Sequence, residues 1–204
     1  STTGALSNQV NLIDSTNLNS AHSVAVSPDG KNVYAVAQNA ASIVHWDRDS
    51  TTGALTNQVN LIDSTNLNGA TSVAVSPDGK NVYAVATSSD SIVYWDRDSA
   101  TGALTNQVNL IDSINLITPY SVVVTPDGKN VYAVAISSDS IVYWDRDSTT
   151  GALTNQVNLI DSTNLDAVKG VAVSPDGKNV YAAASNSDTL VSWDRSSIDT
   201  CSIF

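Results

Sequence analysis

The sequence predicts an all-β fold, and more narrowly a four-bladed β-propeller, from its repeats, its strand pattern and its turn residues. The motif GAL[ST]NQVNLIDS begins at four glycines that lie 49 residues apart, Gly4, Gly53, Gly102 and Gly151. A fixed period in this range is typical of propellers, solenoids and repeat arrays. We therefore expect one domain over residues 1–204, with repeats at 4–52, 53–101, 102–150 and 151–199.

Each repeat contains four short segments with the composition of β-strands. In the first repeat, an outer strand D (6–13) precedes strands A (23–26), B (32–37) and C (42–46), and all are rich in Val, Ile, Tyr or Trp. The turn between A and B is Pro-Asp-Gly, in which proline presets φ and glycine accepts a positive φ. Four antiparallel strands per repeat are typical of a propeller blade, with strand A at the centre.

The phase of the repeat predicts how the ring closes. The chain begins with an outer strand, residues 5–13, and ends with three strands, residues 170–193, that lack one. We expect residues 5–13 to pair beside residues 189–193 and to close a monomeric ring, because closure removes an exposed sheet edge. Two chains joined into an eight-bladed ring are the alternative, since four blades make a tight circle.

The repeated motifs resemble those of a known group of propellers. SPDGKNVYA, first seen at Ser27, and TGAL, first repeated at Thr52, are similar to the YVTN-type repeat of lactonase-like and surface-layer-like bacterial families. The resemblance covers all four repeats and implies the type of blade, although such rings usually have about seven blades. It carries no catalytic residue to this chain, because lactonase-like members use acidic residues that include Glu and this chain has none.

The charge of the chain excludes several classes of partner. Nine Lys and Arg stand against 20 acidic residues, and the net charge of -11 repels nucleic acid and anionic membranes. No apolar run reaches the roughly 20 residues of a membrane helix, so we expect no membrane insertion. A start at Ser1 without any Met predicts a secreted or extracellular protein, with an excised fragment or a trimmed tag as alternatives. We expect Cys201 to be an unpaired tail thiol, with an intermolecular disulfide as the alternative.

The repeats differ most in the loops at one end of the blades. In an up-and-down blade, the D–A and B–C connections emerge at the same end, and loops on a rigid scaffold often carry binding residues. Sequence drift in loops without strict turn chemistry is the other explanation. Three repeat positions carry four different residues: Ser20/Gly69/Thr118/Ala167, His22/Thr71/Tyr120/Lys169 and Gln38/Thr87/Ile136/Ser185.

These variable residues predict a ligand site at the mouth of the central channel. The second position lies just before the inner strands, so in a ring of four blades His22 faces Tyr120 and Thr71 faces Lys169. The expected ligand-binding residues are His22, Thr71, Tyr120, Lys169, Asp166, Gln38, Thr87, Ile136 and Ser185.

The chemistry of this mouth predicts a non-catalytic binding module for a polar small molecule or a glycan. The alternative is a small enzyme of the hydrolase, lyase or cyclase type, in which His22, Tyr120 and Lys169 supply a base, an acid and an amine. We expect no metal and no cofactor, because two histidines and no cysteine cluster offer few ligands. His45 and the four tryptophans are predicted to be packing residues, and the DRDSTTG segment a turn rather than a calcium loop.

Overall fold

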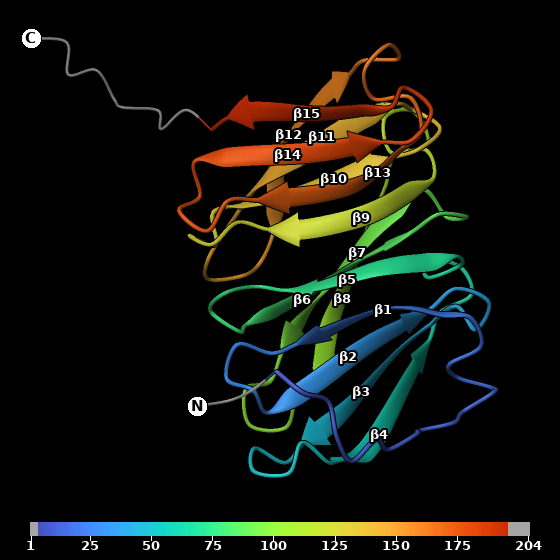
Figure 1. The fold of residues 1–204 in the computed structure, drawn as a ribbon, viewed down its shortest axis with the longest axis vertical. Helices are drawn as coiled ribbons and strands as arrows, with labels where there is room; N and C mark the ends of the chain where they lie inside the picture. The colour runs from blue at the N-terminus through green and yellow to red at the C-terminus, as the bar shows by residue number, and fades with distance from the viewer. Residues whose placement is uncertain (1–3, 196–204) are drawn as a thin grey trace, which may run out of the picture.

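The computed structural model describes residues 4–195, which form four antiparallel sheets (Figure 1). Each sheet corresponds to one blade, and we number the blades in chain order. Blade 1 contains β1 (Ala21–Val26), β2 (Asn32–Ala37), β3 (Ser42–Arg48) and β4 (Leu55–Ile62); blade 2 contains β5 (Ala70–Val75), β6 (Asn81–Ala86), β7 (Ser91–Arg97) and β8 (Leu104–Ile111); blade 3 contains β9 (Pro119–Val124), β10 (Asn130–Ala135), β11 (Ser140–Arg146) and β12 (Leu153–Ile160); blade 4 contains β13 (Val168–Val173), β14 (Asn179–Ala184) and β15 (Thr189–Asp194).

The predicted strands A, B and C are present in every blade, and the all-β prediction is confirmed for the described residues. The sequence NVYAVA forms β2, β6 and β10, which are almost entirely buried because they have a strand on each side and a neighbouring blade against the sheet. The Pro-Asp-Gly turns also form as expected, and Gly30 at the first of them has φ of 70°. The repeated sequence therefore produces repeated local structure.

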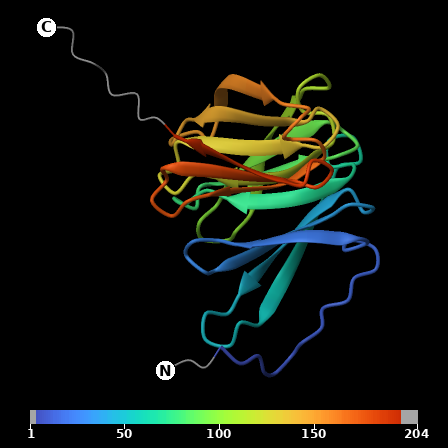
Figure 2. The ribbon, with the colours of Figure 1, turned by 45° about the horizontal axis from the view of Figure 1, so that its top comes forward.

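The blades follow one another in an arc, as Figures 1 and 2 show. The first strands of the blades, β1, β5, β9 and β13, lie beside one another in this order and form the inner side of the arc. Strand order within the four-stranded blades runs without crossovers from this inner strand to the outer one. This is the arrangement of a propeller-type fold.

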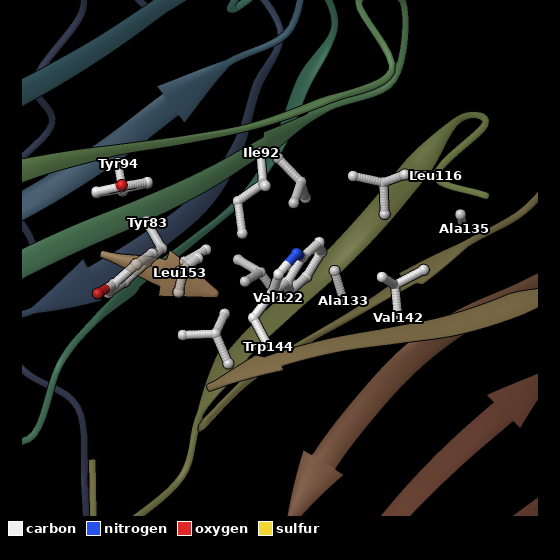
Figure 3. Packing of buried hydrophobic residues seen from close by; sticks show 12 residues of the cluster. Tyr83, Ile92, Tyr94, Leu116, Val122, Ala133, Ala135, Val142, Trp144 and Leu153 are labelled. Atoms are coloured by element: carbon white, nitrogen blue, oxygen red, sulfur yellow. The ribbon is translucent and has the colours of Figure 1, made fainter. Parts of the chain in front are cut away.

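Apolar clusters between successive blades hold the arc together. Figure 3 shows the cluster between blades 2 and 3, where Tyr83 and Ile92 of one blade meet Val122, Trp144 and Leu153 of the next. Equivalent clusters join blade 1 to blade 2 and blade 3 to blade 4. Trp95 and Trp144 lie in these clusters, and the half-buried Trp193 packs against the third. Trp46 is buried in a separate cluster of blade 1, so the prediction that the tryptophans are packing residues is confirmed.

The expected closure of the ring differs from the structure. Residues 6–13 form no strand, and the sheet of β13, β14 and β15 has three strands. The same sequence, with Thr in place of Ser7, forms β4, β8 and β12, each of which pairs with the strand just before it in the chain. Residues 6–13 have no such preceding strand, and β15 lies at the other end of the arc (Figure 1). Their side chains are consequently exposed, with Leu6 at 101% and Ile13 at 89%.

Two further expectations concern the membrane and the chain end. Within residues 4–195 there is no helix of the length and hydropathy needed to cross a membrane. Cys201 lies outside the described residues, so its state stays a prediction.

Candidate functional site at the inner strands

The variable loops of each blade are joined to each other by their backbones. The N–H at the B–C position donates to the carbonyl at the D–A position in every blade, for example from Gln38 to Ser20 at 2.9 Å. The carbonyl residue has a positive φ each time, 59° at Ser20 and 77° at Gly69. Two of the three variable positions are therefore in direct contact. The bonded pairs are Gln38 and Ser20, Thr87 and Gly69, Ile136 and Thr118, and Ser185 and Ala167.

The remaining variable position, that of His22, is the extra residue of a β-bulge in each inner strand. In β1, Ala21 pairs with Ala37 and Ser23 pairs with Val36, so His22 between them has no partner across the ladder. A bulge re-aims the side chain of the extra residue, and bulges are frequent beside active sites. The same shift of register occurs at Thr71, Tyr120 and Lys169.

His22 is exposed and held in one orientation by the next blade. Its Nδ1 atom lies 2.9 Å from the carbonyl oxygen of Thr71. Because a carbonyl oxygen only accepts hydrogen bonds, Nδ1 carries a proton, and in the neutral imidazole Nε2 then carries the lone pair. The imidazole therefore presents a fixed basic nitrogen.

Tyr120 reaches this nitrogen from two blades away. Its hydroxyl lies 3.3 Å from Nε2 of His22 and donates to it, and the two rings meet edge to face with centroids 5.3 Å apart. Blades 1 and 3 thus bring together the two residues that the sequence expected to face each other. They meet along the curved inner side of the arc rather than across a closed ring.

Thr71 and Lys169 lie in different surroundings. Thr71 is 2% exposed, and its hydroxyl donates to the carbonyl of Pro119 at 3.2 Å. The side chain of Thr71 is thus used in packing β5 against β9, and its carbonyl orients His22. Lys169 is exposed on β13, the inner strand beside β9, at the bulge position that Tyr120 occupies in blade 3.

The remaining predicted residues lie in the loops next to the inner strands. The hydroxyls of Thr87 and Ser185 donate to the carbonyls of Gly69 and Ala167, so both support loop structure. Asp166 accepts a hydrogen bond from the Asn186 side chain at 3.2 Å. Gln38 and Ile136 are half-buried in the B–C loops of blades 1 and 3.

Residues 60–169 match the model of a protein family described as "Lactonase, 7-bladed beta-propeller". The match covers more than half of the 204 residues. This chain belongs to that lactonase family. The resemblance to lactonase-like propellers is therefore confirmed, while the YVTN-type label stays a prediction. No curated protein matches this lactonase-family chain.

Solved structures of larger proteins share the fold of this lactonase-family chain. A Bacteroides uniformis protein, provisionally assigned as a 6-phosphogluconolactonase, is 21% identical, with a TM-score of 0.73 over 86% of this chain and 50% of its own. The periplasmic gluconolactonase of Pseudomonas aeruginosa is 19% identical, with a TM-score of 0.69 over the same shares. Hydrazine synthase of Kuenenia stuttgartiensis is 21% identical, with a TM-score of 0.64 over 94% and 49%. The chain thus spans about half the length of these structures.

The prediction of a non-catalytic binding module is contradicted by these findings. The family is named for an enzyme, and two of the similar structures carry gluconolactonase names. The enzyme alternative is favoured instead. The sequence pointed to the binding reading because the chain lacks the Glu of lactonase-like members and has no nucleophile motif, although water activated by a histidine needs neither.

The lactonase-family chain also contains a buried polar network whose residues do not vary between the repeats and were not predicted from the sequence. Arg97 at the end of β7 inserts between blades 1 and 2, where its guanidinium donates to Asp29 at 3.1 Å, Asn32 at 2.6 Å and the hydroxyl of Tyr34 at 2.9 Å. Its side chain is 1% exposed. Burial raises the pKa of Asp29, but hydrogen bonds from Ser27, the Lys31 N–H and Arg97 outweigh it and lower that pKa to about 2.

The same network recurs in the next junction, from Arg146 to Asp78, Asn81 and Tyr83. These residues are identical in the repeats, so the signal that could have revealed them was invariance combined with charge.

His45 and the acidic turns have structural roles. His45 is 4% exposed, stacks at 5.7 Å against Tyr34, and its Nδ1 has no hydrogen-bond partner. Asp49 accepts the N–H groups of Thr51 and Thr52 and so closes the predicted turn. Residues 4–195 hold no group of three or more His, Cys, Asp or Glu side chains arranged for a metal ion.

Proposed function

We propose that this chain hydrolyses a lactone, the cyclic ester of a sugar acid, at the pair formed by His22 and Tyr120. The family match and the gluconolactonase names of similar structures support the reaction class. The observation that carries the choice of site is the orientation of His22, whose Nδ1–H is bound to the Thr71 carbonyl so that Nε2 is the nitrogen that can act as a base. A histidine oriented by a third group is the usual arrangement of a catalytic base.

In the proposed mechanism, Nε2 of His22 removes a proton from a water molecule that attacks the lactone carbonyl carbon. The ester C–O bond of the ring then breaks, and the leaving alkoxide takes the proton back from the imidazolium. The products are a hydroxyl group and a carboxylic acid, which ionises at neutral pH. No further reactant is needed besides water.

Tyr120 and Lys169 would stabilise the charge that develops during attack. The Tyr120 hydroxyl lies 3.3 Å from Nε2 and can turn its hydrogen toward a carbonyl oxygen bound beside the imidazole. Lys169 is exposed on the neighbouring inner strand, and its ammonium group would attract the carboxylate of the product. The half-buried Gln38 and Ile136 would contact the rest of the substrate.

The test measures ring opening of gluconolactone by proton release above the spontaneous rate. We expect His22→Gln to lower kcat/KM by roughly 100-fold or more, the usual contribution of a general base. The matched control is His45→Tyr, which removes the other histidine and installs the residue found at the equivalent positions 94 and 143. This control should keep the wild-type rate.

A second variant separates the roles of the pair. Tyr120→Phe should lower kcat more than it raises KM, because the hydroxyl acts on charge that forms in the transition state. A wild-type chain that opens no lactone would contradict the proposed reaction. Full activity in His22→Gln would instead move the reaction to another site.

A further inference from the structure

The last blade exposes a surface that every other blade buries. Leu190 of β15 is 74% exposed, whereas Ile43, at the same repeat position in blade 1, is completely buried. Tyr181 is 36% exposed, whereas Tyr34 is fully buried. We call this surface, formed by Tyr181, Leu190 and the turn carboxylate of Asp176, the tail face of blade 4.

The first blade exposes the opposite half of the same junction. Val24 and Val26 of β1 are 66% and 53% exposed, whereas Val73, the equivalent of Val24 in blade 2, is 6% exposed. Arg48 donates to the carbonyl of Gly30 at 3.0 Å, and within residues 4–195 no carboxylate lies at ion-pair distance from it. We call the surface formed by Val24, Val26 and Arg48 the head face of blade 1.

The two faces match because the chain already contains this junction three times. Blade 2 presents Val73, Val75 and Arg97 to blade 1, and these are the same residue types as on the head face. The tail face of blade 4 presents Tyr181 and Asp176 where blade 1 presents Tyr34 and Asp29. Three positions differ on the tail side: Leu190 replaces Ile43, Ala183 replaces Val36, and Ser192 replaces His45. The last two changes make the side chains of the tail face smaller than those of blade 1.

Within residues 4–195 the sheet of blade 4 has no outer strand, and an unpaired copy of the outer-strand sequence lies at residues 6–13. Residues 8–13 have the sequence NQVNLI, as in β4, β8 and β12, yet they pair with no strand in the described chain. The end of this segment is already anchored, since Asp14 accepts a hydrogen bond from Gln58 at 2.7 Å, as Asp63 does from Gln107. Its direction is therefore set toward the blade that would precede blade 1.

A cavity marks the place that this segment would fill. It lies between blades 3 and 4, has a volume of about 1230 Å³ and is lined by Tyr132 and Trp193 among others. In the preceding junction, Leu153 packs beside the equivalent Trp144 and is 9% exposed. By the repeat, the matching residue of the N-terminal segment is Leu6.

We infer that two copies of this chain join head to tail into one ring, in which each N-terminal segment completes blade 4 of the other copy. Residues 6–13 of one copy pair with β15 of its partner, Leu6 enters the cavity, and Arg48 binds the carboxylate of Asp176 across the new junction. The curvature required is close to that of the family: an eight-bladed ring needs half a circle from four blades, and four blades at the spacing of a seven-bladed ring span slightly more, so each junction must open slightly. Two such contacts related by a two-fold axis close the assembly.

The test is the mass of the full chain in solution, measured by light scattering and by sedimentation over a range of concentrations. We expect twice the chain mass of 21.3 kDa. Leu6→Asp should raise the dissociation constant at least about 100-fold, because each ring buries two copies of this leucine. Leu6 is fully exposed in the single chain, so this change leaves its folding intact. The control is Ile114→Asp, at another exposed apolar residue, which should leave the dimer unchanged.

A charge exchange tests the junction independently. Arg48→Asp and Asp176→Arg should each weaken the dimer, and the double variant should restore it. A wild-type chain that stays monomeric, or a dimer that Leu6→Asp leaves intact, would overturn the inference. A monomer in which residues 6–13 are protected from hydrogen exchange would show closure within one chain instead, and would overturn it equally.

Discussion

The two histidines have different chemistry because their surroundings differ. His22 is exposed at a bulge, and a backbone carbonyl fixes its tautomer. His45 is enclosed between sheets, and burial, with a smaller contribution from the Arg97 charge, lowers its pKa against the opposing effect of Asp47. A residue type alone therefore does not identify a site, and its neighbours decide whether it reacts or packs.

The buried His45 predicts a loss of stability in mild acid. The folded chain keeps this imidazole neutral, while the unfolded chain takes up a proton near the ordinary pKa of 6.5. The stabilisation is hence complete above that pH and decreases as the pH falls through it. The free energy of unfolding of His45→Tyr, relative to wild type, should rise from pH 8 to pH 5 in denaturant titrations. A constant difference would mean that the pKa of His45 is the same in the folded and the unfolded chain.

At the level of the element, the junction between blades depends on the turn that joins strands C and D. The turn of blade 2 lies against strand β2 of blade 1, where the hydroxyl of Tyr34 donates to the carbonyl of Gly102 at 2.7 Å. A Cβ atom added at Gly102 would overlap the side chain of Asn32, which Arg97 and Asp47 already hold in place. Close approach of two backbones explains the glycine here.

Substitutions at Gly102 and Gly53 distinguish the effect of this close contact from the effect of backbone strain. Gly102 has φ of 73° and Gly53 has φ of 76°, but nothing lies within 4 Å of a Cβ at Gly53. Alanine at either position should lower the free energy of unfolding by about 1–2 kcal/mol, because the backbone there is left-handed. Gly102→Ala should lower it by a further ~1–3 kcal/mol, because the added Cβ overlaps the side chain of Asn32. Urea denaturation of dilute protein would measure both, and equal losses would show that Asn32 moves aside.

At the level of the whole molecule, the arc is a chain of nearest-neighbour contacts. Three apolar clusters and three arginine networks of residues 4–195 each join one blade to the next. The direct contact of His22 with Tyr120 is an exception, since it connects blades 1 and 3 through a long side chain. Stability should therefore be close to a sum over junctions.

This architecture predicts which pairs of substitutions are additive. Asp29→Asn and Asp127→Asn act on different junctions, so their losses should add to within about 0.5 kcal/mol. Asp29→Asn and Arg97→Gln act on one ion pair. The loss of stability in their double variant should therefore differ from the sum of the two single losses by more than about 0.5 and up to roughly 3 kcal/mol. Denaturant titrations of the single and double variants provide the double-mutant cycles for both pairs of substitutions. Strong coupling between the distant pair would indicate cooperativity through the whole arc.

Much of the fold could be predicted because its determinants are local. Alternation of apolar residues and the Pro-Asp-Gly turns specify strands A, B and C, and the structure contains them with nearly the expected bounds. The bulge at His22 and the network of Arg97 could not be predicted in this way. Both depend on the register and distance between strands that the repeat pattern leaves open.

The sequence by itself determined the all-β class, the repeat and the end of the blades at which the copies differ. Only the tertiary structure decided the curvature of the arc, the contact of His22 with Tyr120, and the failure of residues 6–13 to meet β15 within one chain. Strands and turns follow from hydrogen bonding and φ preferences over a few residues. The angle between blades follows from how buried side chains such as Tyr34 and Trp95 fit together, and small differences in that angle accumulate from blade to blade.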